Sequence, residues 1–128
     1  MNRATRQWVK KAEDDFGLAE TTAAGPIPLH DQVAFHCQQA AEKYLKAVLN
    51  EGGLAIPKTH DLEALLDLLL PAYPVLRSHR RGLAALTNFA VAVRYPGKNA
   101  NRRQAVSCLR WAARARATCR EFLGLPPP

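Results

Sequence analysis

The sequence predicts an all-α protein, an up-and-down four-helix bundle with an additional short helix. Three observations predict this class. Hydrophobic residues make up 48% of the 128 residues, yet runs of β-branched residues are few, so strand-forming segments are scarce. Apolar side chains recur at steps of three and four residues in successive segments, which is the spacing of one helix face. Gly and Pro separate these segments, and short connections favour antiparallel neighbouring helices.

We expect the first helix over residues 4–22, where apolar side chains form one stripe. The segment Gly25-Pro26-Ile27-Pro28 should end it. Asp31 is predicted as the N-cap of the second helix, which should run to Asn50 and stop at Gly52-Gly53.

The second helix is expected to lie at the centre of the bundle. Residues 35–49 contain no Gly or Pro and are rich in good helix formers. The apolar stripe consists of Cys37, Ala41, Tyr44, Leu45 and Val48. The polar side chains, which we expect beside or opposite that stripe, are Gln38, Gln39, Glu42, Lys43 and Lys46. The Glu42 and Lys46 side chains stand one turn apart and favour an ion pair on the helix surface.

Three further helices are expected. Thr59 should cap a short third helix, with Asp61 in its first turn and Pro71 beyond its end. The fourth helix should begin between residues 74 and 81 and end at about Arg94.

A turn of Pro-Gly type follows at residues 95–99. Asn101 is predicted to cap the last helix, which should span residues 102–123. We expect one domain over residues 1–128, with 126–128 as a loose tail.

Charge and cysteine usage restrict the class of protein. The net charge is +7, with 18 Lys and Arg against 11 Asp and Glu. This favours an anionic partner, such as nucleic acid, a nucleotide or an acidic protein, or else only a well-solvated basic surface. The cysteines Cys37, Cys108 and Cys119 have no paired spacing, which indicates a reducing compartment. No signal peptide or membrane span is evident, so we expect a soluble cytoplasmic protein.

Few residues indicate chemistry. None of the four histidines is spaced with another His or Cys as metal ligands are, and no glycine-rich phosphate loop is present, so we expect neither a metal nor a cofactor. Arg94-Tyr95-Pro96 places a fixed cation and an aromatic ring at a helix end. Arg94 could satisfy the last helix carbonyls or bind a phosphate or carboxylate, and both interpretations stay open.

Several short motifs, taken in their order along the chain, together resemble a known protein family. Asp15 stands beside Phe16 in the first helix. The later motifs are Gln39-Ala40-Ala41-Glu42-Lys43, Thr59-His60-Asp61-Leu62 and Arg94-Tyr95-Pro96. Together they resemble the HEPN domain family (higher eukaryotes and prokaryotes nucleotide-binding) over nearly the whole chain.

The resemblance implies a helical bundle that commonly forms a homodimer. It also implies one half of a two-component or toxin–antitoxin module, whose other half is a minimal nucleotidyltransferase. A nucleotide, RNA or that partner would bind near Arg94, and the candidate binding residues are Arg94, Tyr95, Lys98, Arg102 and Arg103.

Some members of the family are metal-independent ribonucleases, which carry an Arg followed a few residues later by a His. Arg94 matches the Arg, but Asn99, Ala100 and Asn101 stand where the His is expected. Asn cannot shuttle a proton near neutral pH, which favours a binding protein over an enzyme. An endoribonuclease using Arg94 with Asn99 or Asn101 remains the alternative. In a second alternative the protein is a structural bundle, and Asp15, Lys43 and Arg94 only brace its helices against one another.

Overall fold

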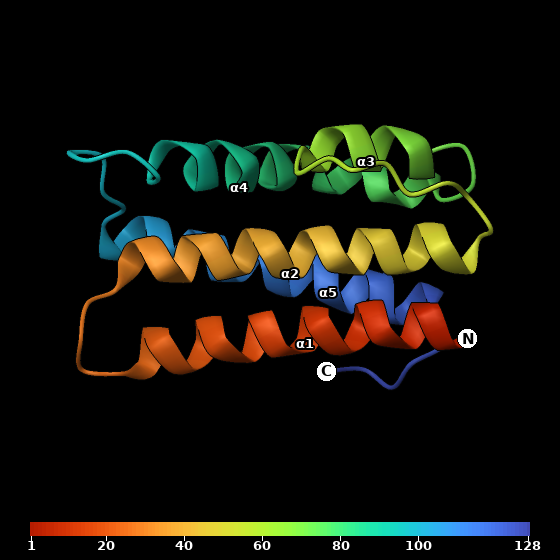
Figure 1. Ribbon diagram of the computed structural model, residues 1–128, viewed down its shortest axis with the longest axis horizontal. Helices are drawn as coiled ribbons and strands as arrows, with labels where there is room; N and C mark the ends of the chain where they lie inside the picture. The colour runs from red at the N-terminus through yellow and green to blue at the C-terminus, as the bar shows by residue number, and fades with distance from the viewer.

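The structure is a computed structural model that describes residues 1–128. It contains five α-helices and one 3-10 helix, and no strand. The elements are α1 (Arg3–Ala24), α2 (His30–Glu51), α3 (Leu62–Leu69), η1 (Pro74–His79), α4 (Arg80–Ala92) and α5 (Arg102–Phe122). The long helices α1, α2, α4 and α5 alternate in direction, and α3 is the additional short helix (Figure 1). The predicted four-helix bundle is therefore confirmed.

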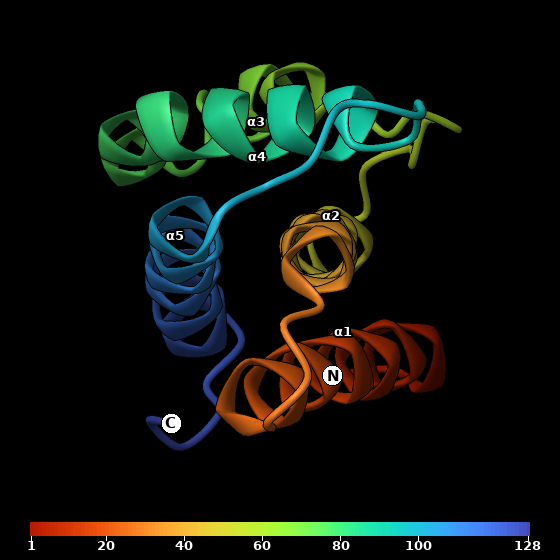
Figure 2. The same cartoon turned by 90° about the vertical axis from the view of Figure 1, so that its left-hand side faces the viewer.

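Helix α2 is the central helix, since it packs against all four other α-helices. Figure 2 shows it nearly end-on, with α1 on one side, α5 beside it, and the α3–α4 layer on the opposite side from α1. The predicted apolar stripe of α2 is fully buried, including Cys37, Tyr44 and Val48. A helix covered on several sides must also bury some of its polar positions, and α2 does so.

Glu42 and Lys46 are one such case: the expected ion pair forms, but its expected position on the helix surface is wrong. Glu42 is 3% exposed and Lys46 6% exposed, with Lys46 Nζ 3.0 Å from Glu42 Oε2. Gln38, one turn earlier, is buried as well. Helical periodicity identifies the apolar face, but it does not show that neighbouring helices cover the flanking polar positions too.

Two helix starts differ from the sequence-based expectation. Helix α2 has Leu29 at its N-cap, and Asp31 lies in the first turn instead. The Asp31 carboxylate accepts a hydrogen bond from the Ala100 backbone N–H at 2.7 Å, and this ties the start of α2 to the segment before α5. A tertiary contact has therefore taken the carboxylate that a local cap would have used.

Helix α3 begins two residues later than Thr59 would place it. Its N-cap is Asp61, whose carboxylate accepts a hydrogen bond from the Glu63 backbone N–H at 3.0 Å. The Thr59 hydroxyl instead accepts from the Asp61 N–H at 3.1 Å, so it shapes the turn before the helix.

The ends of α5 are well defined. The Asn101 side chain accepts a hydrogen bond from the Gln104 N–H at 2.8 Å, and the Gln104 side chain accepts from the Asn101 N–H at 2.9 Å. This reciprocal capping box confirms the predicted cap. At the other end, Arg120 Nε donates to the Pro126 carbonyl at 2.8 Å and joins the tail to the last turn of α5. No helix combines the length and the apolar character that crossing a membrane requires.

Candidate functional site

The turn between α4 and α5 exposes Arg94. Helix α4 ends at Ala92, two residues before Arg94 and earlier than the sequence indicated. The Lys98 N–H donates to the Tyr95 carbonyl at 3.2 Å, and Gly97 lies within this turn with a φ of 82°, which glycine adopts readily. Tyr95 is 64% exposed. The structure thus places a cation and an aromatic ring on the surface, joined to a tight turn.

Arg94 lies between two surface hollows, and its side chain lines both. One hollow, of about 210 Å³, is also lined by Asp31, Gln32, Phe35, Ala90 and Val93. The other, of about 190 Å³, is also lined by Gln38, His60, Asp61, Thr87, Ala90 and Val91. The second hollow therefore brings together residues from α2, α4 and the segment before α3.

Buried Glu42 holds the imidazole of His60 in this second hollow. His60 Nδ1 lies 2.8 Å from Glu42 Oε1. Gln38 Nε2 donates to the same carboxylate at 3.3 Å and to the His60 carbonyl at 2.8 Å. Both the ring and the backbone of His60 are therefore attached to α2, although the His60 side chain is 69% exposed.

This arrangement determines which ring nitrogen is free. An ionised carboxylate only accepts hydrogen bonds, so Nδ1 of His60 must carry a proton. In the neutral imidazole, Nε2 is then the unprotonated nitrogen and can accept a proton from a ligand. Lys46 pairs with the other oxygen of Glu42, which balances the charge of this buried carboxylate.

The remaining residues of the Arg94 segment are distributed over different surfaces. Lys98 and Asn99 are exposed in the turn, whereas the Asn101 side chain is used as the α5 cap. Arg102 lines another hollow, formed with the connection between α1 and α2. Arg103 is exposed on α5. A single chain therefore does not bring Arg102 to the hollows beside Arg94.

Asp15 and Lys43 join α1 to α2 on another side of the central helix. Lys43 Nζ forms an ion pair with Asp15 Oδ2, and His36 Nδ1 lies 3.0 Å from Asp15 Oδ1. Gln39 donates to the Gln38 side chain at 2.9 Å. The motif residues on α2 thus divide into a brace toward α1 and a group that supports His60.

A second polar cluster joins α1 to α5. Glu13 accepts hydrogen bonds from Arg116 Nε at 2.7 Å and Arg116 Nη2 at 2.9 Å, and the Tyr44 hydroxyl also donates to it. The bond from Arg116 is the main reason that the pKa of Glu13 is lowered to about 2. Burial, followed by the bond to Glu13, raises the pKa of Tyr44 to about 12. Glu13 therefore stays charged and Tyr44 stays neutral over the physiological pH range, which suits a structural brace.

Sequence reasoning missed the participation of Gln38 and Thr87 and the proximity of His60 to Arg94. The one-turn spacing of Gln38 and Glu42 was the available signal, since it places both on one side of α2. Thr87 accepts a hydrogen bond from the Leu62 N–H at 3.2 Å and so joins α4 to the start of α3. No group of three or more His, Cys, Asp or Glu side chains is arranged to hold a metal ion.

Comparison with known proteins supports the fold. The sequence model of the HEPN domain family matches residues 5–122 of this chain. The solved structure of TT1696 from Thermus thermophilus superposes with a TM-score of 0.84 at 24% sequence identity, covering 95% of this chain and 99% of that one. The structure of ST0689, described as an archaeal HEPN homologue, superposes with a TM-score of 0.73 at 24% identity, covering 94% and 98%. At this identity the two structures establish the fold alone. No curated protein matches the chain.

Proposed function

Because the chain belongs to the HEPN domain family, we propose that it is a cytoplasmic protein that binds the phosphate groups of a nucleotide or RNA at the Arg94 turn. The observation that carries this proposal is the position of Arg94, exposed between two hollows. A guanidinium can bind a phosphate in bidentate fashion. Lys98 adds a second exposed cation to the same turn.

Binding should be measured by titrating single-stranded RNA and nucleotides at two salt concentrations. Arg94→Gln should weaken binding about tenfold, as expected for the loss of one charge-assisted contact. Arg110→Gln is the matched control, since Arg110 is exposed on α5 and lines neither hollow. Equal affinities of the two variants would contradict the proposal, because general surface charge would then explain the binding.

A homodimer is part of this proposal. Phe35, Val91 and Tyr95 are exposed apolar side chains beside Arg94. Covering them with a second copy would remove apolar surface from water and place two Arg94 side chains near one groove. Val91→Glu should then shift the mass measured by light scattering from dimer to monomer. A monomeric wild-type protein at micromolar concentration would contradict this arrangement.

The proposed protein partner is a minimal nucleotidyltransferase, as the family implies. Co-expression with the product of a neighbouring nucleotidyltransferase gene should yield a complex that survives gel filtration. Separate elution of the two proteins would leave nucleotide or RNA binding as the function of this chain.

The hollow that His60 and Arg94 share favours a second function, metal-independent RNA cleavage. His60 Nε2 would accept the proton of a ribose 2′-hydroxyl, whose oxygen attacks the adjacent phosphorus. The bond from phosphorus to the 5′-oxygen breaks, and that oxygen leaves with a proton from solvent. The products are a 2′,3′-cyclic phosphate and a 5′-hydroxyl. Arg94 would stabilise the negative charge that develops on the phosphate oxygens.

The two functions differ in their response to His60→Gln. Cleavage of single-stranded RNA in the presence of EDTA should fall about a hundredfold or more in His60→Gln if His60 is the base. Binding of RNA should change little, since Arg94 is retained. Arg110→Gln serves as the control, since Arg110 is exposed on α5 and lines neither hollow. Cleavage that is unaffected by His60→Gln would exclude His60 as the base and favour the binding function.

A further inference from the structure

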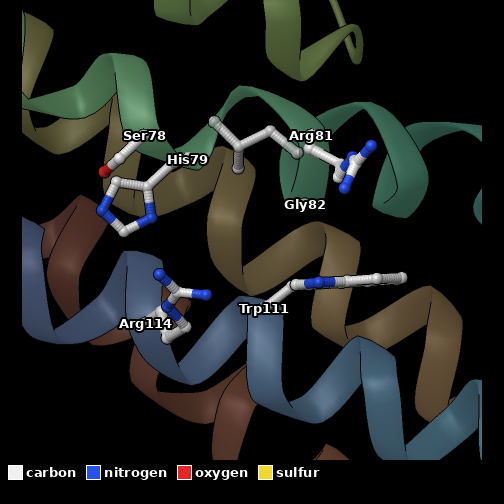
Figure 3. Close-up of a pocket in the computed structure, with 7 residues that line it drawn as sticks. Ser78, His79, Arg81, Gly82, Trp111 and Arg114 are labelled. Carbon is white, nitrogen blue, oxygen red and sulfur yellow. The ribbon is translucent and has the colours of Figure 1, made fainter.

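Another hollow lies at the other end of α4 from Arg94. It has a volume of about 110 Å³, and it is lined by Ser78, His79, Arg81, Gly82, Leu83, Trp111 and Arg114. Figure 3 shows that the end of η1 and the first turn of α4 form one wall and that α5 forms the other. The sequence motifs and the proposed function use none of these residues.

Gly82 allows α5 to lie close to α4 at this point. A Cβ atom at position 82 would lie 2.8 Å from Trp111 Cδ1 and 2.9 Å from Trp111 Cγ. The Trp111 ring also stacks on Phe89, with the ring centroids 6.3 Å apart and the planes at 24°. One side of the hollow is therefore built from a firmly packed aromatic ring.

The charge in the hollow is positive and uncompensated. The arginines that form ion pairs in this structure are Arg80, Arg116 and Arg120. The nearby acids of α3, Glu63 and Asp67, both pair with Arg80. No carboxylate lines the hollow, so Arg81 and Arg114 bring two positive charges to it without an acidic partner. Positive charge gathered in one hollow attracts anions.

His79 adds a neutral polar group beside Arg114. Its Nε2 lies 3.0 Å from the Thr118 hydroxyl, which leaves Nδ1 for another partner. Burial, and then the charge of Arg114, lower the pKa of His79. The ring is therefore neutral at physiological pH. In Figure 3 the Arg114 guanidinium reaches toward His79, with the Ser78 hydroxyl beside the ring.

We propose that this hollow is a phosphate-binding site, in which Arg114 holds the phosphate group of a small ligand beside Ser78 and His79, and Arg81 adds positive charge at the other end of the hollow. The Ser78 hydroxyl is a further donor, and so is the His79 ring in the tautomer in which the Thr118 hydroxyl donates to Nε2 and Nδ1 carries the proton. Guanidinium groups match the geometry of phosphate oxygens, and a partly enclosed position strengthens each charge-assisted bond. The volume accommodates one tetrahedral anion, so the rest of the ligand extends into solvent.

Inorganic phosphate is the probe for the first experiment. Its titration should be followed by the indole N–H signals of the two tryptophans in a proton–nitrogen correlation spectrum. The Trp111 signal should shift in a saturable way, whereas Trp8, on α1, provides an internal reference. Arg114→Gln should weaken binding about tenfold, and Arg110→Gln, four residues earlier on α5, should leave it unchanged. Both side chains are exposed, so both variants should fold.

Two results would overturn the proposal. One is the absence of a saturable Trp111 shift at millimolar phosphate, and the other is an equal loss in Arg114→Gln and Arg110→Gln, which would indicate non-specific attraction. The source of the phosphate is then identified by repeating the titration with a nucleoside 5′-monophosphate and with short RNA with and without a 5′-phosphate. Arg94→Gln should retain phosphate binding here, so this site and the Arg94 site can fail independently.

Discussion

The imidazole of His60 contacts the buried carboxylate of Glu42, with 2.8 Å between Nδ1 and Oε1. His60 and Arg94 also line the same hollow. The chain lacks a histidine in the residues after Arg94, and the fold places an imidazole beside Arg94 from the segment before α3. The orientation of that imidazole depends on a charge pair inside α2, so the Glu42–Lys46 pair links stability and the candidate site.

Replacing Glu42 with Ala should destabilise the protein by about 3 kcal/mol, because it leaves the buried Lys46 ammonium without a partner. Urea denaturation would measure this loss. Lys10→Ala is the control, since Lys10 and Asp14 form an exposed pair at the same spacing. Loss of the Lys10–Asp14 pair should lower the free energy of unfolding by less than about 0.5 kcal/mol. Similar losses in both variants would show that the Glu42–Lys46 pair contributes no more than a surface pair.

Gly82→Ala should destabilise the protein by about 1–2 kcal/mol, since the new Cβ would overlap the fixed base of the Trp111 side chain. Gly17→Ala should have the opposite sign. Position 17 lies within α1 and has no atom within 4 Å of an added Cβ. The better helix propensity of Ala should therefore stabilise it by about 0.5–1 kcal/mol. Thermal melts of the two variants provide the comparison, and stabilisation in both would contradict the close α4–α5 contact.

Acid should weaken the fold through Glu13. Its pKa is lowered from 4.5 to about 2 in the folded state. The stabilising contribution is therefore complete above the unfolded value and is lost as the pH falls from about 4.5 toward 2. Solvent screens this partly exposed pair, so we expect about 1–2 kcal/mol. Melting temperatures between pH 2 and 7 should show a shallower acid limb in Glu13→Gln. An unchanged acid limb would assign the effect to other carboxylates.

Asn101→Ala should cost about 1 kcal/mol, because it removes half of the α5 capping box. Asn99→Ala, two residues earlier in the exposed turn, should have little effect on stability. Chemical denaturation distinguishes the two. Equal effects would mean that the turn as a whole, rather than the cap, stabilises the start of α5.

The expected helices agree with the structure where the local pattern offers a single choice. The buried stripe of α2 and the cap at Asn101 depend on residues within one or two helical turns, and both were predicted. The starts of α2 and α3 were not. Asp31 was available as a cap, but its carboxylate bonds to Ala100, which is distant in the sequence. Asp61 caps α3 in place of Thr59, and two neighbouring candidate caps cannot be ranked from residue type alone.

The candidate site was predictable only in part. Arg94 could be identified from its place before a turn, because that context is local. The participation of His60 could not, since nothing in the spacing of the two residues indicates that α2 and α4 enclose the segment before α3. The unpaired Arg81 and Arg114 are a similar case, because their common hollow forms only where α4 packs on α5.

By itself, the sequence determined that the chain forms an all-α bundle around α2 and that an arginine precedes the turn into the last helix. Helix periodicity and capping act over a few residues, so they can be read without a structure. Only the tertiary structure decided that Glu42 and Lys46 are buried, that Glu42 orients His60, and that His60 shares a hollow with Arg94. Burial and long-range contact depend on how all the helices pack together, which no single segment encodes.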